Sequence, residues 1–266
     1  MDRNRTHRSV RPHRGESVHQ LLQPLRGHRT RPSPSSRPVG DVTTRIRPDV
    51  VVFDVVETLA SLDAVQSRLS RLQQPTWLLQ RWFTRLVRDA MAITAAHGYR
   101  TFLDVAASSL QAETRGTLTP AQIDFAVAGF GELTAQPDAA DAVDTAKRAG
   151  FRVFTLSNGS EATTRAFLDR AGLTPQIEEV LSVDEVKAWK PAPPPYELAV
   201  SRARVPAERV ALVAVHSWDI HGAHRAGLTT GWCPRLETVA TPAFTGADVS
   251  SDTLPGVIDA LAALPR

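Results

Sequence analysis

The chain contains very little cysteine, and this scarcity excludes two kinds of site. Cys233 is the single cysteine among 266 residues, so the chain can form neither an intrachain disulfide framework nor a cysteine-based zinc site. Because Cys233 follows Gly231 and Trp232 in an apolar setting, we expect a buried structural thiol at this position and not a nucleophile.

Long apolar runs are also missing from the sequence. No run approaches the ~20 residues that a membrane-spanning helix needs, and the N-terminus lacks the apolar core of a signal peptide. The apolar residues that are present suffice for the core of one large domain or two small ones. We therefore expect a cytoplasmic protein with no membrane partner.

Acidic residues are scarce at the N-terminus, where arginine is abundant. Residues 1–47 contain eleven arginines and three acidic residues, so they carry +8, and the rest of the chain carries −5 of the net +3. This Arg-, His-, Pro- and Ser-rich composition cannot form a core, so we expect a disordered basic N-terminal extension.

A basic arm that binds nucleic acid or an anionic membrane is the alternative interpretation of residues 1–47. We favour a dispensable extension, with no nucleic-acid partner, because the segment has neither lysine nor aromatic residues. Val42 is a plausible alternative start.

A buried strand is predicted at residues 50–53, and a lone carboxylate follows it. The run is short, apolar and rich in β-branched residues, as in the interior strands of a parallel sheet. Asp54 would lie at the carboxyl end of this strand, where open α/β sheets bind their ligands. The carboxylate is either a cap or turn residue, or else a nucleophile or metal ligand, and this stretch alone leaves both open.

The rest of the sequence predicts an α/β protein with a helical insertion. Within residues 62–134, apolar residues such as Trp82, Leu86 and Ala90 recur at helical spacing, and Thr119-Pro120 opens a further helix. From Pro137 onward, strands and helices alternate, which favours a doubly wound parallel sheet. We expect a Rossmann-like core of residues 48–61 and 135–266, with residues 62–134 as a helical cap.

The alternating pattern of the second part fixes approximate bounds for its elements. Gly150 and Gly172 end two of the helices. The predicted helices are 137–150, 160–171, 195–204, 220–226 and 255–264, the predicted strands are 151–156, 177–183, 210–215 and 229–233, and residues 234–252 are a predicted loop.

Polar residues follow each predicted strand, and four groups would meet at one edge of the sheet. In chain order they are Asp54 with Thr58, Ser157-Asn158-Gly159, Lys190-Pro191, and His216-Ser217-Trp218-Asp219. The second group is also ordinary turn chemistry, and Asp219 could simply cap the next helix. Lys190 is harder to explain in this way, because the chain has only three lysines.

These four groups, in this order and spacing, resemble the motifs of the haloacid dehalogenase superfamily, and most of all its 2-haloacid dehalogenase branch. The segments that carry the resemblance are Phe53 to Leu59, Leu156 to Ser160, Leu181 to Asp184, Lys190-Pro191, Tyr196 to Leu198, Trp218-Asp219 and Gly222-Ala223. The similarity covers residues 49–235 and leaves the N-terminal tail outside. It implies a Rossmann-like core with a helical cap inserted after the first strand.

Two positions separate the chemistries within this superfamily. Its phosphatases have a second aspartate two residues after the nucleophile, which protonates the leaving alkoxide, and they use Mg²⁺; here that residue is Val56. Their metal-binding aspartate, five residues before the equivalent of Asp219, is here Ala214. A hard cation would have too few oxygen ligands. The resemblance therefore implies metal-independent dehalogenation without a cofactor, and a Mg-dependent phosphatase is the alternative.

The implied mechanism is two-step covalent catalysis on a small 2-haloalkanoic acid. Asp54 would displace halide and form an aspartyl ester, and water activated by Asp219 would hydrolyse that ester. Lys190 would keep Asp54 ionised through its positive charge. The resemblance implies that Thr58, Ser157 and Asn158 bind the substrate carboxylate and orient Asp54, and that Tyr196 matches a family tyrosine at the substrate site. The expected partner is this small carboxylate, and a homodimer is the assembly considered.

The cap position that faces the halide departs from the family pattern. The branch has an arginine there, and counting back from Tyr99 places Phe83 at that position. Arg81 and Arg85 lie two residues away along the helix and therefore on another face. With Ala214, this departure also leaves open a weakly active or non-catalytic binding protein on the same scaffold.

A histidine stands where the branch has an amide. We include His216 with Phe83 among the substrate-site residues, since an imidazole titrates near neutrality and could help to activate water. His221 and His224, together with His216 and Asp219, form an alternative metal cluster. We favour a solvated surface for the histidine pair and expect no metal.

Overall fold

The computed structural model describes residues 45–266. The expected disorder of residues 1–47 concerns a segment of which residues 1–44 lie outside this description. Arg45 and Arg47 contact the folded part of the chain: Arg45 Nε lies 2.9 Å from Asp248 Oδ1, and the Arg47 amide donates to Pro265 O at 2.6 Å. The described fold therefore begins no later than Arg45, before the expected start of the core at residue 48.

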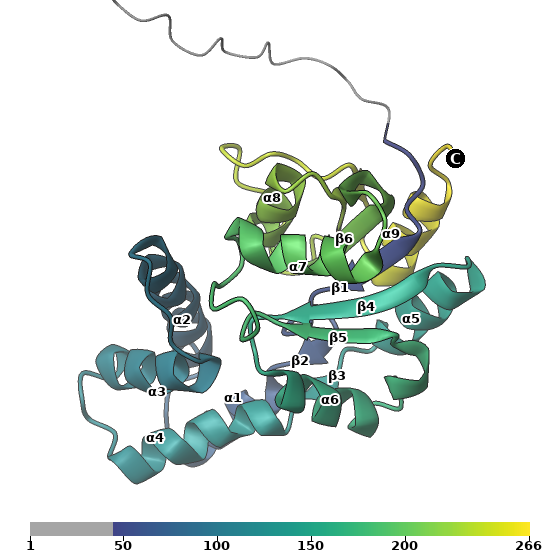
Figure 1. Ribbon diagram of the computed structural model, residues 1–266. Helices are drawn as coiled ribbons and strands as arrows, with labels where there is room; N and C mark the ends of the chain where they lie inside the picture. The colour runs from purple at the N-terminus through teal and green to yellow at the C-terminus, as the bar shows by residue number, and fades with distance from the viewer. Residues whose placement is uncertain (1–44) are drawn as a thin grey trace, which may run out of the picture. The chain divides into compact units, whose positions relative to one another are not determined.

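A six-stranded parallel sheet forms the centre of the core (Figure 1). In spatial order its strands are β5 (Glu179–Ser182), β4 (Arg152–Ser157), β1 (Val50–Phe53), β6 (Val210–Ala214), β7 (Thr229–Trp232) and β8 (Val249–Ser250). β1 pairs in parallel with both β4 and β6, so the strand order reverses on its two sides. The predicted doubly wound sheet is confirmed, and its switch point lies at the end of β1.

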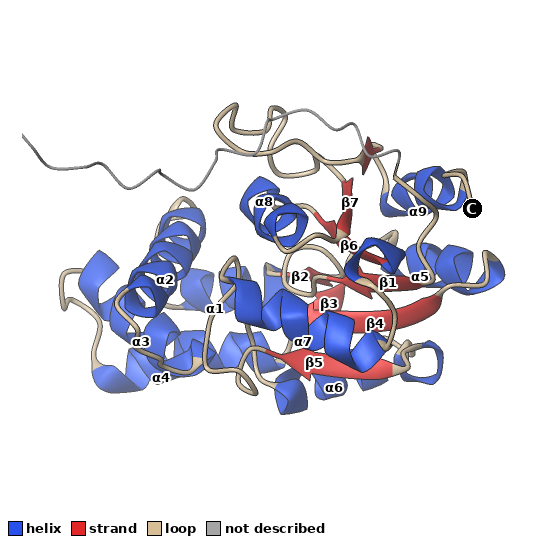
Figure 2. Ribbon diagram, turned by 45° about the horizontal axis from the view of Figure 1, so that its top comes forward, coloured by secondary structure: helices blue, strands red, loops and turns tan. Residues whose placement is uncertain are grey.

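The two faces of the sheet are covered by different helices (Figure 2). Val50 and Val52 pack in one apolar cluster with residues of α7 and α8, whereas Val51 and Phe53 pack in another with residues of α5, α6 and α9. These helices are α5 (Ala139–Arg148), α6 (Glu161–Arg170), α7 (Pro193–Ala203), α8 (Ser217–Arg225) and α9 (Leu254–Ala262). All four β1 side chains are completely buried, which contributes about 1.5–3 kcal/mol for each.

The cap is helical and is inserted after β1. Its helices are α1 (Asp63–Arg71), α2 (Leu78–Ala95), α3 (Phe102–Glu113) and α4 (Pro120–Val127). The predicted start of α4 is confirmed, because Thr119 and Gln122 form a reciprocal capping box and Pro120 occupies the first turn. Buried Trp82 joins α2 to α3, since its Nε1 donates to Ala106 O at 3.0 Å.

Two short strands connect the cap with the core. β2 (Ala60–Ser61) and β3 (Thr134–Ala135) pair in antiparallel register where the chain enters and leaves the cap. Three 3-10 turns complete the described elements: Ala128–Gly131, Thr174–Gln176 and Ala207–Arg209.

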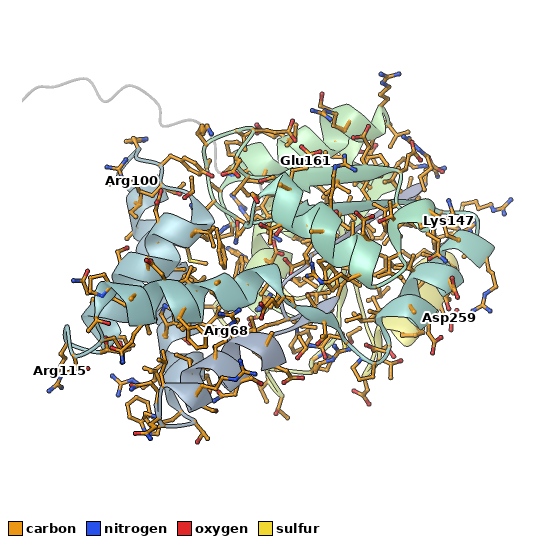
Figure 3. All side chains as sticks on the ribbon, turned by 90° about the horizontal axis from the view of Figure 1, so that it is seen from below. Arg68, Arg100, Arg115, Lys147, Glu161 and Asp259 are labelled. Atoms are coloured by element: carbon orange, nitrogen blue, oxygen red, sulfur yellow. The ribbon has the colours of Figure 1, made fainter. Side chains whose placement is uncertain are left out.

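Exposed charged side chains project from both cap and core, as Arg115, Lys147 and Asp259 illustrate (Figure 3). Within residues 45–266, no helix is long and apolar enough to cross a membrane. Cys233 is buried, as predicted, and its thiol donates to Asp252 O at 3.5 Å.

Candidate active site

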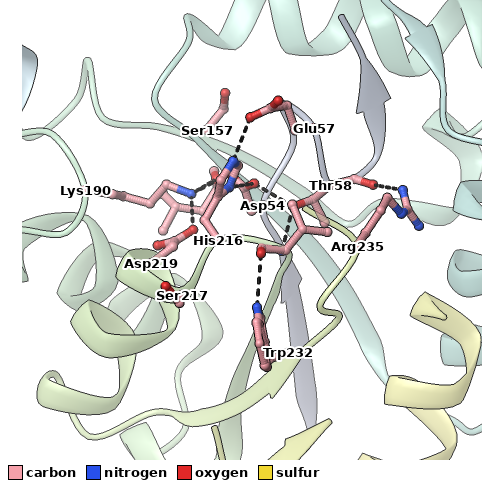
Figure 4. A network of polar contacts seen from close by, with 12 residues as sticks. Asp54, Glu57, Thr58, Ser157, Lys190, His216, Ser217, Asp219, Trp232 and Arg235 are labelled. Carbon is pink, nitrogen blue, oxygen red and sulfur yellow. Dashed lines mark hydrogen bonds and ion pairs between the residues drawn. The ribbon is translucent and has the colours of Figure 1, made fainter. Parts of the chain in front are cut away.

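Asp54 follows the last residue of β1 and is the centre of a buried polar network (Figure 4). Its backbone N–H donates to Val213 O at 3.0 Å, which continues the pairing with β6 beyond the strand. Asp54 as a whole residue is 5% exposed. Oδ1 accepts from Lys190 Nζ at 2.7 Å, and Oδ2 accepts from Thr58 Oγ1 at 2.7 Å. The carboxylate is therefore fixed at the carboxyl edge of the sheet.

Lys190 is completely buried and uses every donor that it has. An ammonium group has three N–H donors, and Nζ donates to Asp54 Oδ1 and Asp219 Oδ2, each at 2.7 Å, and to Leu156 O at 3.0 Å. Burial would lower the pKa of Lys190, but the two carboxylates raise it above its ordinary value. Lys190 is thus a permanent cation between two carboxylates.

The two carboxylates bound by Lys190 differ in acidity. Burial would raise the pKa of Asp54, but Lys190 and His216 hold it well below the usual range. Burial raises the pKa of Asp219, and the charge of Asp54 adds to this effect against the opposing charge of Lys190. Asp54 is therefore held ionised, and Asp219 is the stronger base of the two carboxylates.

Asp219 lies in the first turn of α8, because this helix begins at Ser217. The sequence placed the start of the helix at Ile220, and that prediction was wrong by most of a turn. Asp219 is completely buried, and its Oδ1 accepts from the Tyr196 hydroxyl at 2.6 Å. Burial and the neighbouring carboxylate raise the pKa of Tyr196 well above its ordinary value, so its hydroxyl stays a donor.

Close packing of α7 against α8 brings Tyr196 to Asp219. Gly222 of α8 faces this contact, and a Cβ atom there would lie 2.5 Å from the Tyr196 hydroxyl and 2.6 Å from Pro191 Cβ. Only a glycine allows the two helices to approach this closely.

A cavity of about 20 Å³ adjoins Asp54 between core and cap. Its lining consists of Asp54, Val56, Phe83, Val87, Phe102, Asn158, Trp189, His216 and Trp218. Phe83 and Val87 come from α2, so the cap wall of this cavity is apolar. Asn158 contributes an amide, whose Oδ1 accepts from the Lys190 backbone N–H at 3.0 Å.

A second cavity, of about 220 Å³, adjoins the first. Val56 and Phe102 line both cavities, and Ser157 lines only the larger one. The Ser157 Oγ accepts from the Gly159 N–H at 2.9 Å, which leaves its own O–H free to donate. The structure therefore brings all nine sequence-predicted site residues to the same region, although Ser157 lies at its margin.

His216 and Glu57 form a pair beside Asp54. His216 Nε2 lies 2.9 Å from Glu57 Oε2, and Nδ1 lies 3.3 Å from Asp54 Oδ2. Burial would lower the pKa of His216, but the two carboxylates outweigh it and raise the pKa to about 10. His216 is a cation at neutral pH, so this geometry does not support the expected help in activating water.

Glu57 is the site residue that the sequence reasoning missed. It lies within the segment Phe53 to Leu59, but nothing in its spacing indicates a partner 159 residues away. The left-handed backbone of Glu57, with φ of 65°, could not be read from the residue type either.

The alternative metal cluster does not come together. His221 Nδ1 accepts from the Thr245 N–H at 3.0 Å, and its ring stacks on Phe244. His224 Nε2 lies 4.0 Å from Asp248 Oδ1. Within residues 45–266, no three His, Cys, Asp or Glu side chains are placed to hold a metal ion.

A comparison with models of known protein families identifies the family to which the chain belongs. The model of the haloacid dehalogenase-like hydrolases matches residues 48–227. The chain belongs to this hydrolase family. Its predicted resemblance to the superfamily is thereby confirmed, and the matched range holds every one of the site residues described above.

Two relatives of this chain are (S)-2-haloacid dehalogenases. The chain is 36% identical over 129 residues to (S)-2-haloacid dehalogenase 1 of Pseudomonas sp. strain CBS-3, which covers 42% of this chain and 57% of that enzyme, less than two thirds of its length. It is 31% identical over 188 residues to (S)-2-haloacid dehalogenase 4A of Burkholderia cepacia, covering 67% of this chain and 80% of that enzyme.

The same fold occurs in solved structures. L-2-haloacid dehalogenase from Xanthobacter autotrophicus, with chloropropionic acid covalently bound, matches with a TM-score of 0.75 at 22% identity. The match covers 82% of this chain and 99% of that one. At this identity the likeness concerns the arrangement of core and cap.

Proposed function

We propose that this protein hydrolyses (S)-2-haloalkanoic acids to halide and the corresponding 2-hydroxy acids. The observation that carries the proposal is Asp54, an ionised and buried carboxylate on the wall of a largely apolar cavity. The choice of the (S) enantiomer follows the names of the two curated relatives.

In the first step an oxygen of Asp54 attacks C2 of the substrate. A bond forms between this oxygen and C2, and the carbon–halogen bond breaks, with its electron pair leaving on the halide. Halide leaves without a proton, so a valine at position 56 suits this chemistry. In-line attack inverts C2, so (S)-2-chloropropionate would yield (R)-2-hydroxypropionate.

In the second step water attacks the carboxyl carbon of the Asp54 ester. Asp219 takes a proton from the water; its raised pKa makes it the better base of the two carboxylates. Since both of its oxygens accept hydrogen bonds, from Tyr196 and Lys190, the water must share one of them. Lys190 stays beside the ester and stabilises the oxyanion. The bond between the carboxyl carbon and the ester oxygen breaks, and the proton on Asp219 passes to the departing alkoxide oxygen, which releases the hydroxy acid. The Asp54 carboxyl group then loses its proton to solvent, so both carboxylates are restored.

The phosphatase alternative has less support from the residues present. Val56 lines the cavity next to Asp54 and has no proton to give to a leaving alkoxide. Ala214, at the end of β6, offers no oxygen ligand where a metal-binding carboxylate would be needed.

Halide release from the two enantiomers of 2-chloropropionate tests the proposed function. We expect release from the (S) enantiomer that is unchanged by EDTA and abolished in Asp54→Asn. Absence of release from any 2-haloacid, together with EDTA-sensitive hydrolysis of phosphate esters, would favour the phosphatase.

A single turnover in ¹⁸O-labelled water tests the covalent route. Water oxygen enters the Asp54 carboxyl group in the second step, so mass spectrometry of the peptide with Asp54 should show the label. Label in the hydroxy acid alone would mean that water attacks C2 directly. The expected homodimer and cytoplasmic location stay predictions, and light scattering of the purified protein tests the first.

A further inference from the structure

We propose that His216, positioned by Glu57, is the receptor for the carboxylate group of the substrate. The identity of the ligand rests on the proposed function, but the receptor itself would bind any small carboxylate that fits the cavity. We place this role on the core side of the site, because on the cap side the cavity is lined by an aromatic ring, Phe83.

Lys190 and Thr58, which hold Asp54, have no donor to spare, whereas the Ser157 hydroxyl and the Asn158 amide on the cavity walls are uncharged donors. All three N–H donors of Lys190 are engaged by protein acceptors. The Thr58 hydroxyl donates to Asp54 and accepts from the Val215 N–H at 3.2 Å. His216 Nδ1, by contrast, is buried and makes no well-directed hydrogen bond, although it lies 3.3 Å from Asp54 Oδ2. A protonated imidazole donates through both nitrogens, so Nδ1–H, which only a poorly directed 3.3 Å contact joins to Asp54, is the charged donor at the cavity.

No other cation among the described residues lines this cavity. The cap contributes Phe83, Val87 and Phe102 to the lining. Arg235 lies in the same network (Figure 4), but its guanidinium is held by Asp138 Oδ1 at 2.5 Å and by Thr58 O at 3.4 Å. Among the residues that the structure describes, the one positive charge that lines this cavity is therefore on His216.

Glu57 fixes the direction of this charge. Its backbone is in the left-handed region, where glycine is favoured and another residue is strained. The conformation is held by the Glu57 N–H, which donates to Ala60 O at 2.7 Å, and by Gln136 Nε2, which donates to Glu57 O at 3.1 Å. With Oε2 bound to Nε2, the imidazole turns Nδ1 toward Asp54 and the cavity. Glu57 acts through His216 and is a positioning residue.

The geometry of displacement favours the carboxylate over the halide as the group that His216 receives. In-line attack places the halide on the side of C2 opposite Asp54. His216 lies beside Asp54, so it faces a substituent of C2 and not the leaving group. The charged groups that face the imidazole are Asp54 and Glu57, and Lys190 and Asp219 lie on the other side of Asp54.

Binding of propionate, an unreactive analogue of the proposed substrate, tests the assignment in the full-length protein. We expect the wild-type dissociation constant, measured by calorimetry, to change little between pH 6 and 9, and the His216 Hε1 proton to shift in NMR spectra on binding. His216→Asn, which has the amide of the family, should bind propionate about tenfold more weakly at every pH, since a charge-assisted hydrogen bond is lost.

Two variants of Glu57 separate charge from backbone. Glu57→Gln and Glu57→Gly both remove the carboxylate, and the glycine also suits the left-handed backbone. Each should lower the pKa of His216 and weaken propionate binding about tenfold as the pH rises from 6 to 9. Glu132→Gln is the matched control, because that carboxylate pairs with Arg68 away from the site.

The outcomes distinguish this proposal from the proposed function. Wild-type affinity in His216→Asn, or titration of His216 near its ordinary pKa in the wild type, would overturn the receptor role. If the wild type binds propionate as expected but releases no halide from any 2-haloacid, the receptor stands and the proposed function fails. If halide is released, His216→Asn should raise KM more than it lowers kcat.

Discussion

The two oxygens of the Asp54 carboxylate lie in different surroundings. Oδ1 faces Lys190, which is completely buried and has all its donors engaged. Oδ2 faces Thr58 and His216, and the imidazole keeps one donor without a well-directed partner. Both sides supply positive charge, but only the second can also bind a ligand. The difference separates the task of holding the nucleophile from the task of receiving the substrate.

Removal of the charge on the closed side should have the largest effect. Lys190→Met leaves Asp54 and Asp219 buried without their shared cation, so we expect a loss of about 3–5 kcal/mol in the free energy of unfolding. Halide release should disappear as the pKa of Asp54 rises. Urea denaturation and an activity assay measure both, with the exposed Lys147→Met as control. Unchanged stability of Lys190→Met would mean that the charge of Lys190 does not hold the buried carboxylates in the fold.

Removal of the charge on the open side should give a smaller effect that depends on pH. The pKa of His216 is raised from 6.5 to about 10 in the folded state. Its charge therefore stabilises the fold fully below about pH 6.5, and this contribution is lost as the pH rises through about 10. The difference in unfolding free energy between wild type and His216→Asn should narrow over that interval. A difference that is constant with pH would contradict the charged state of His216.

A charge placed on the cap wall should compensate for a missing charge on the core wall. Phe83→Arg in a His216→Asn background should restore about tenfold in propionate affinity. In the wild type the same substitution should change affinity little, since His216 already holds the carboxylate. Equal gains in both backgrounds, measured by calorimetry, would show that the two positions act independently.

The smallest expected effect concerns the backbone of Glu57. Glu57→Gly and Glu57→Gln lose the same ion pair, but the glycine relieves the left-handed strain. Glu57→Gly should therefore be about 1 kcal/mol more stable than Glu57→Gln in urea denaturation. Equal stabilities would mean that the backbone at this position carries no measurable strain.

The side that holds the nucleophile was the more predictable one from the sequence. Asp54 and Lys190 follow separate predicted strands, and parallel topology brings strand ends to one edge. Polar residues after apolar runs are local signals, so their convergence could be inferred without coordinates. The confirmed α/β fold rests on the same kind of signal, since strand and helix periodicity are read over short windows.

The side that receives the substrate was less predictable. The Glu57–His216 contact joins residues 159 positions apart and depends on one left-handed residue, and neither feature has a local pattern. The start of α8 was also missed, because Ser217 and Trp218 carry no apolar periodicity that separates helix from turn. The two residues of β8 were predicted as loop for a related reason: they form a strand only by pairing with β7.

Gly222 carries no functional group, yet the spacing between α7 and α8 depends on it. A methyl group at this position would separate Tyr196 from Asp219 without altering a single polar atom of the site. Such a residue limits how far the chain can diverge in evolution while keeping its chemistry, although a comparison of catalytic residues alone would never reveal the constraint. Loss of activity in Gly222→Ala, with folding retained by circular dichroism, would expose it.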